Sequence, residues 1–160
     1  MKRWLLYGLV LASLDAGAAC QPTTDPLENM AEAEIILAGP GERRVRLQVR
    51  VADDYRERAA GFQYICPETI ETTAIYFVFE RPRRPSFHMH NVEAPLDIAF
   101  IDAEGLIVSI QRMEPYVIGA REQKTYGPQV EVAGALEARA GYFAGEWITE
   151  NEWRVESLEQ

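Results

Sequence analysis

Two histidines, His88 and His90, have the residue type and spacing best suited to ligand chemistry. They are the only histidines in the chain. If residues 86–92 form a strand, side chains two residues apart point to the same face, with Cα atoms about 6.6 Å apart. Their imidazoles could then bind one transition-metal ion at N–metal distances of about 2.0 Å. We therefore treat copper or zinc binding through this pair as one hypothesis.

A complete metal site would need ligands beyond these two imidazoles, which make only half of a tetrahedral site. Oxygen ligands elsewhere in the chain could come from Asp97, Glu137 or Glu93. Cys66 and Met113 offer sulfur, which together with histidine suits copper. The alternative interpretation is that both histidines face solvent or hydrogen-bond within a polar pocket. The sequence alone does not decide between these interpretations.

Asn91 and Asp97 extend the histidine segment into a predicted ligand surface. Asp97 follows Pro95 at the start of a predicted strand, where its carboxylate could be an acid, a base or a ligand anchor. The structural alternative, which we favour for Asp97, is that it accepts backbone amides in the bend or hydrogen-bonds Asn91. Ligand sites are usually concave with a few convergent polar groups. We predict such a site around residues 86–97, covered by residues 114–131 and built from His88, His90, Asn91 and Asp97.

No recognisable catalytic motif accompanies these residues. Neither Ser86 nor Ser109 lies in a nucleophile elbow, and Cys66 lacks the local signature of a thiol nucleophile. Asp97 and Glu137 could serve a glycosidase, since that chemistry requires only a suitable separation in space. No phosphate-binding loop or dinucleotide fingerprint is present. A non-catalytic binding module is therefore the leading interpretation, and a small hydrolase is the alternative.

The elements that would position these residues are mostly strands. Residues 44–51 alternate apolar and polar side chains, which predicts a strand with one buried face. Residues 34–38 and the turn Gly39-Pro40-Gly41 complete a predicted hairpin. Asp53 begins a short helix that ends at Gly61. Further strands are predicted at residues 72–79, 86–92, 96–102, 106–113, 135–138 and 152–155. The expected fold is mainly β, a sandwich or jelly-roll-like barrel with one short helix.

Residues 86–105 carry a family resemblance. They read Ser-Phe-His-Met-His-Asn, then Pro-Leu-Asp-Ile, then Phe-Ile-Asp and Gly. This order resembles the bacterial family called domain of unknown function 192, which typically reads Ser-Phe-Trp-Met-Lys-Asn-Thr, then Pro-Leu-Asp, Phe-Ile-Asp and Gly. The resemblance extends over about residues 42–155, and His88 and His90 stand where the family has Trp and Lys. It implies a compact, mainly β domain of jelly-roll-like type and no securely assigned activity.

The start of the chain predicts export. Lys2 and Arg3 precede an apolar run at residues 4–14 and then small residues, which is the order of a secretory signal peptide at residues 1–19. Cys20 follows, and we expect its thiol to be lipidated, with simple secretion as the alternative. Residues 20–33 are polar and contain prolines, which predicts a flexible tether before a single domain at residues 34–157. The expected location is the periplasm, either free or as a membrane-anchored lipoprotein.

The net charge and the cysteine content restrict the classes of binding partner that are expected. The chain has a net charge of −9, so nucleic acid and anionic membranes are poor candidates, and an unknown small ligand or protein is expected. Membrane contact would come only through lipid on Cys20. In that case Cys66 would stand alone as a small buried residue, whereas without lipid an oxidising compartment would allow a disulfide. The arginines within residues 81–85 could receive an anionic group or form a solvated loop held open by prolines.

Overall fold

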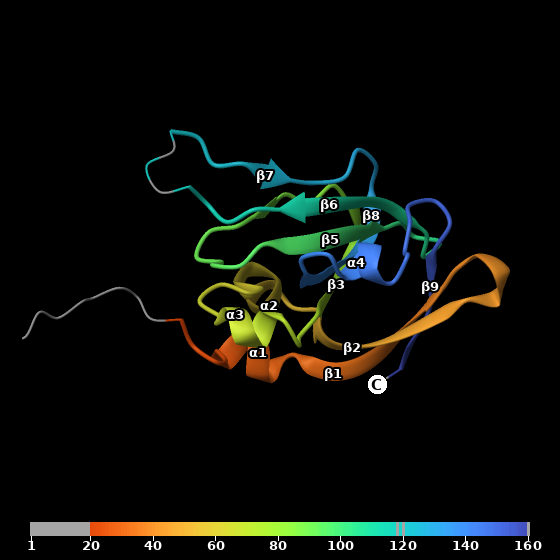
Figure 1. Ribbon diagram of the computed structural model, residues 1–160, viewed down its shortest axis with the longest axis horizontal. Helices are drawn as coiled ribbons and strands as arrows, with labels where there is room; N and C mark the ends of the chain where they lie inside the picture. Colours follow the sequence, from red (N-terminus) through yellow and green to blue (C-terminus); the bar gives the residue numbers. More distant parts are fainter. Residues whose placement is uncertain (1–19, 118, 120, 160) are drawn as a thin grey trace, which may run out of the picture.

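The fold is built on one seven-stranded sheet with the strand order β6-β5-β8-β3-β2-β1-β9, beside a two-stranded sheet of β4 and β7 (Figure 1). It is given by a computed structural model, which describes residues 20–117, 119 and 121–159. The predicted signal peptide at residues 1–19 lies outside the described residues. Within the described part of the chain, no helix has both the length and the apolar character needed to cross a membrane.

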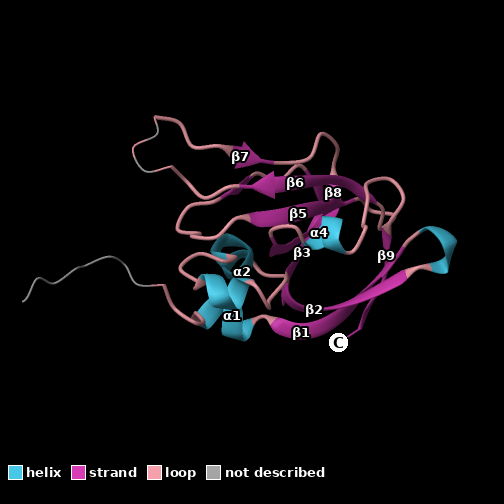
Figure 2. Ribbon diagram, in the orientation of Figure 1, coloured by secondary structure: helices cyan, strands magenta, loops and turns pink. Residues whose placement is uncertain are grey.

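Strands dominate the described residues, and the helices are short (Figure 2). The strands are β1 (Ala31–Ala38), β2 (Arg44–Ala52), β3 (Ile75–Arg83), β4 (Phe87–His88), β5 (Leu96–Ile101), β6 (Ile107–Met113), β7 (Thr125–Tyr126), β8 (Val132–Arg139) and β9 (Arg154–Glu159). The helices are α1 (Asp25–Asn29), α2 (Tyr55–Ala60), α3 (Pro67–Ile70) and α4 (Tyr142–Gly145), with a 3-10 turn at Pro40–Glu42. The expected mainly β class is confirmed, but four α-helices replace the single one predicted.

β1 and β2 form the predicted hairpin. They pair antiparallel from Ala31 opposite Val51 to Ala38 opposite Arg44. The turn between them contains Gly41 with φ 65°, a left-handed conformation that glycine adopts without a steric penalty. β2 then pairs with β3 in parallel, so the chain must cross over between them. α2 and α3 make that crossover, and Figure 1 shows them clustered with α1 at one end of the molecule.

β5 separates two hydrophobic cores because both of its faces are buried. Leu96, Ile98 and Phe100 belong to a first core, which also takes side chains from α1, α3 and the turn after α2. Ala99 and Ile101 face a second core. The same alternation divides β8 between Ala135 in the first core and Leu136 and Ala138 in the second.

The two edge strands of the large sheet, β6 and β9, meet at one end. The Ile107 amide donates to the Trp153 carbonyl, and the Val155 amide donates to the Gly105 carbonyl, both at 2.8 Å. Gly105 has φ 82°, and a Cβ at this position would lie 2.8 Å from the Val155 oxygen, so the contact requires glycine. The sheet is therefore barrel-like without being closed, in agreement with the expected sandwich or barrel class.

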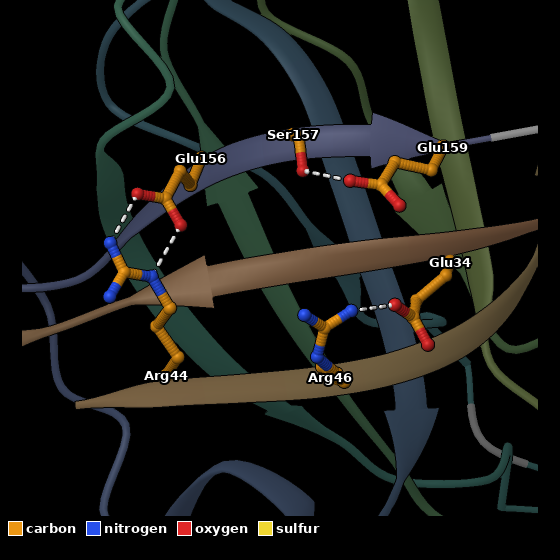
Figure 3. Close-up of polar contacts among 6 residues, drawn as sticks. All are labelled: Glu34, Arg44, Arg46, Glu156, Ser157 and Glu159. Carbon is orange, nitrogen blue, oxygen red and sulfur yellow. Dashed lines mark hydrogen bonds and ion pairs between the residues drawn. The ribbon is translucent and has the colours of Figure 1, made fainter.

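Charged side chains connect the strands at the β9 edge (Figure 3). Arg44 of β2 reaches across β1 to Glu156 of β9, with Nε–Oε2 and Nη2–Oε1 distances of 2.7 and 2.8 Å. Arg46 pairs with Glu34 of β1. These groups are largely exposed, so the ion pairs add little to stability. Their main effect is to place charges beside the edge strand β9, which discourages it from pairing with strands of other chains.

Several predicted boundaries differ from the structure because prolines and turns act differently in this context. β3 continues through Pro82 to Arg83, where a loop was expected, because its pairing with β8 is irregular between Val78 and Arg83 and does not require every amide. The strand expected at residues 86–92 ends at His88, and a turn follows. α2 is capped by Asp54 rather than Asp53.

The segment predicted to be a flexible tether is packed against the domain. Cys20 forms a disulfide with Cys66, and Gln21 hydrogen-bonds with the backbone on both sides of Ile65. Leu27 is 4% exposed and belongs to the first core. The burial of its side chain offsets the conformational entropy that is lost when this segment is ordered. The interpretation of Cys66 as a lone buried thiol is therefore wrong. Because a sulfur in a disulfide cannot also carry a lipid thioether, the disulfide and the predicted lipidation of Cys20 are mutually exclusive.

Candidate functional site

A cavity of about 300 Å³ lies between α2, β3, β8 and the segment that leads into β4. We call it the Glu137 pocket, after the one carboxyl group among its lining residues. Its aromatic wall consists of Tyr55, Phe62, Phe77, Phe79 and Phe87. Its other polar residues are Arg58, Gln63, Arg83, Ser86 and His88. An apolar cavity with a few converging polar groups is the usual form of a small-molecule site.

Glu137 is buried in the face of the sheet that carries the first core. It lies on β8 opposite Ile75 of β3 and Ile98 of β5, and it is only 5% exposed. Burial raises the pKa of its carboxyl group to about 8, and neither a charge nor a hydrogen bond opposes that shift. The carboxyl group is therefore mostly neutral at pH 7, and the neutral acid can donate one hydrogen bond.

The turn after α2 brings the backbone close to this carboxyl group. α2 begins with a capping box, in which the Glu57 amide donates to Asp54 Oδ1 at 2.8 Å. It ends at Gly61, whose φ is 48°. A Cβ at Gly61 would lie 3.7 Å from Phe77 Cζ and 3.8 Å from Glu137 Oε2. Glycine therefore permits this turn and leaves the space beside the carboxyl group open.

Edge-to-face aromatic contacts shape the floor of the pocket. The Phe77 and Phe87 rings are 5.1 Å apart at 89°, and Phe87 contacts Phe100 of the first core at 5.8 Å. Such pairs favour a fixed geometry over a loosely packed one. Phe87 belongs to β4, which is held by pairing with Tyr126 of β7. The loop expected to cover the site thus contributes a short strand that supports one wall.

A second cavity of about 320 Å³ adjoins the first and shares Arg58, Phe79 and Arg83 with it. Arg58 Nη1 donates to the Val78 carbonyl at 3.1 Å and also to a carbonyl near the start of α2. The Arg83 guanidinium lies over the Phe79 ring, 5.7 Å from its centroid. The sequence predicts an anion site or a solvated loop for the arginines of residues 81–85, but it does not indicate that Arg58 lies beside them.

The two histidines lie at the surface. His88 ends β4 and lines the Glu137 pocket, whereas His90 lies in the following turn, so the argument from a shared strand face does not hold. Their ring centroids are 6.3 Å apart, and the His90 amide donates to His88 Nδ1 at 3.3 Å. Within the described residues, no group of three or more His, Cys, Asp or Glu side chains could hold a metal ion. The pair therefore lacks a third ligand of these types among the described residues, and the metal hypothesis is left to experiment.

Asn91 and Asp97 do not converge with the histidines. Asn91 Nδ2 donates to Gln63 Oε1 at 3.2 Å beside the pocket. Asp97 accepts from Arg112 Nε at 2.5 Å and from the Gly141 amide at 2.7 Å. Its structural interpretation is therefore correct in kind, although the amide comes from the turn after β8 and not from its own bend.

Asp97 and Glu137 lie on opposite faces of the sheet. Asp97 is paired with Ala138 and Ile98 with Glu137, so neighbouring positions alternate in direction. The two carboxyl groups cannot flank one glycosidic bond or bind one metal ion. Of the four predicted ligand residues, only His88 lines the pocket. The sequence suggests Glu137 only as a partner for other groups, and its place in the largely apolar run of residues 132–138 is the signal of its burial.

Comparisons with known proteins agree with the sequence resemblance. The family of domain of unknown function 192, described as an uncharacterized ACR, matches residues 36–152. A crystal structure of a candidate transcription regulator from Sinorhizobium meliloti 1021 is 26% identical, with a TM-score of 0.68 over 79% of this chain and 94% of that one. A protein of unknown function from Novosphingobium aromaticivorans DSM 12444 shares the fold at 21% identity, with a TM-score of 0.71 over 88% and 95%. A search of curated proteins found no match. The chain belongs to the family of domain of unknown function 192.

Proposed function

We propose that this domain is a non-catalytic binding module that holds a small organic ligand in the Glu137 pocket. The observation that carries the proposal is the Glu137 carboxyl group, 5% exposed at an aromatic cavity and shifted in pKa by burial alone. A carboxyl group that lines an aromatic cavity can form a hydrogen bond with a ligand that enters it. A strongly shifted carboxyl group in a cleft is a recognised mark of a functional site.

The geometry favours binding over hydrolysis. Ser86 and His88 line the pocket together with Glu137, which brings the three residue types of a hydrolytic triad to one cavity. However, His88 Nδ1 accepts a hydrogen bond from the His90 amide, and burial alone accounts for the shift at Glu137. A triad requires the base to be hydrogen-bonded to both the nucleophile and the acid. Among the described residues, no hydrogen bond joins Ser86 to His88 or His88 to Glu137, as activation of Ser86 would require.

The test of this proposal is a titration with 3-phenylpropan-1-ol, which has an apolar body and a hydroxyl group. Amide shifts are followed by NMR in protein purified after expression of the full chain. We expect saturable shifts at Gly61, Phe77 and Glu137. Ala59→Trp, at an exposed position on the pocket wall, should abolish them. Ala103→Trp, in the exposed turn between β5 and β6, is the matched control and should not. Shifts that survive in Ala59→Trp would place the binding elsewhere.

We also propose that the protein acts in an oxidising compartment outside the cytoplasm and without a lipid anchor. Support comes from the signal-peptide pattern of residues 1–19 and from the Cys20–Cys66 disulfide, which is typical of exported proteins. The intact mass of the native protein decides the matter. A chain that begins at Cys20 and lacks two hydrogens fits the proposal, whereas an added diacylglyceryl mass would identify a lipoprotein and overturn it.

A further inference from the structure

Four arginines near the Glu137 pocket are not explained by a site for a neutral ligand. The chain has a net charge of −9, and the ion pairs of the described residues use the arginines at positions 44, 46, 50, 112 and 139. None of those pairs involves Arg58, Arg81, Arg83 or Arg84. In an acidic protein, such a group of cations without carboxylate partners marks a surface suited to an anion.

Two of these arginines lie where the two cavities meet. Arg58 and Arg83 line both the Glu137 pocket and the adjoining cavity. The hydrogen bond to the Val78 carbonyl holds Arg58 in place, and the Phe79 ring supports Arg83. Glu80, which is exposed to solvent, also lines the second cavity, together with three arginines. The boundary between the cavities is therefore basic, and the first cavity beyond it is aromatic.

We propose that the natural ligand is a small organic anion, whose anionic group binds Arg58 and Arg83 while its apolar body fills the Glu137 pocket. This inference rests on the proposed binding function. Guanidinium groups bind carboxylate, phosphate and sulfonate oxygens through paired, charge-assisted hydrogen bonds. The aromatic side chains of the pocket offer an apolar surface to the rest of the ligand. A ligand with an anionic group and an apolar body contacts both the arginines and the aromatic side chains. A purely apolar or a cationic ligand does not use the arginines.

Glu137 is compatible with an anion as long as it is protonated. Burial raises the pKa of its carboxyl group to about 8, so at pH 7 it is mostly neutral and donates a hydrogen bond to a ligand oxygen. The other titratable groups that line this pocket are Tyr55, Arg58, Arg83 and His88. Ionisation of Glu137 would place a negative charge beside the anion. Affinity for the anion is therefore expected to fall as pH rises above 8.

Three probes of matched size test the inference: 3-phenylpropionate, 3-phenylpropan-1-ol and 3-phenylpropan-1-amine. NMR titrations at pH 7 should show that the carboxylate binds about tenfold more tightly than the alcohol, as expected for one charge-assisted contact. Arg83→Gln should reduce that advantage, because it removes one of the two guanidinium groups, and it should weaken binding of the carboxylate more than binding of the alcohol. Arg84→Gln removes the same charge from a residue that lines neither cavity, and it should change neither affinity.

The outcomes separate the two proposals. If the alcohol or the amine binds at the pocket as tightly as the carboxylate, the binding function stands and the anion inference is overturned. If none of the three shifts the amides of the pocket, the binding function itself fails. Between pH 7 and 9.5, carboxylate binding should weaken in the natural protein and stay constant in Glu137→Gln. Binding that strengthens with pH would point to a cation and would also overturn the inference.

Discussion

Replacing Glu137 by Gln should change how stability depends on pH. Burial raises the pKa of Glu137 from 4.5 to about 8 in the folded state. The unfolded chain therefore binds fewer protons than the folded one between these values, and stability falls as pH rises. The slope approaches about 1.4 kcal/mol per pH unit, which amounts to about 3 kcal/mol between pH 5 and pH 7 as an upper estimate. Gln fills nearly the same volume and does not titrate.

Urea unfolding at pH 5, 6, 7, 8 and 9 measures this difference. The free energy of unfolding of Glu137→Gln, relative to the natural protein, should increase steadily from pH 5 to pH 8 and level off above pH 8. Arg58, Arg83 and His88 line the pocket in both proteins, so the comparison isolates the change at position 137. Glu104→Gln, at an exposed turn position, controls for the loss of one negative charge. A difference that is constant across this range would refute the burial argument.

Four further predictions concern other parts of the molecule. Cys66→Ser removes a disulfide with a sequence separation of 46 and should lower the free energy of unfolding by about 4 kcal/mol in non-reducing urea denaturation. Asp97→Asn weakens contacts to a guanidinium and to a backbone amide, so we expect a loss of about 2 kcal/mol with unchanged binding of the phenylpropyl probes. Gly134→Ala places a Cβ 2.9 Å from the Tyr76 hydroxyl and 3.0 Å from a carbonyl oxygen, which should cost about 1–3 kcal/mol by thermal unfolding. Calorimetry with Zn(II) and Cu(II) should find no tight one-to-one binding, and tight binding lost in the double variant His88→Ala/His90→Ala would restore the metal hypothesis.

Local sequence patterns predicted the strands that have either one regularly buried face or a continuous apolar run. The alternation in residues 44–51 gave β2, and the apolar runs of residues 96–102 and 106–113 gave β5 and β6. Asp102 lies in the predicted turn, where its Oδ1 accepts from the Leu106 amide at 2.8 Å. Each of these features depends on contacts within a few residues or on one repeating face. The sequence therefore carries the necessary signal.

The candidate site depends on contacts that no local pattern contains. Glu137 reaches the pocket because β8 is inserted between β3 and β5, which places the carboxyl group between Ile75 and Ile98. The same pairing turns Asp97 to the opposite face. Gly61 was expected as a helix end, but its closeness to Glu137 follows from the crossover between β2 and β3. Strand order and register therefore decided which of the candidate residues meet.

The disulfide makes the redox state of the surroundings a determinant of the site. Cys66 lies four residues after Phe62, a pocket residue, and its partner Cys20 holds the segment that contains Leu27 against the first core. While both thiols are reduced, that segment is retained by its apolar contacts, a few backbone hydrogen bonds and the hydrogen bond from the Thr69 hydroxyl to the Pro22 carbonyl. Oxidation raises the local concentration of the segment beside the core and restricts the turn after α2. A ligand that binds the oxidised form more tightly than the reduced form would, by thermodynamic linkage, also favour the disulfide.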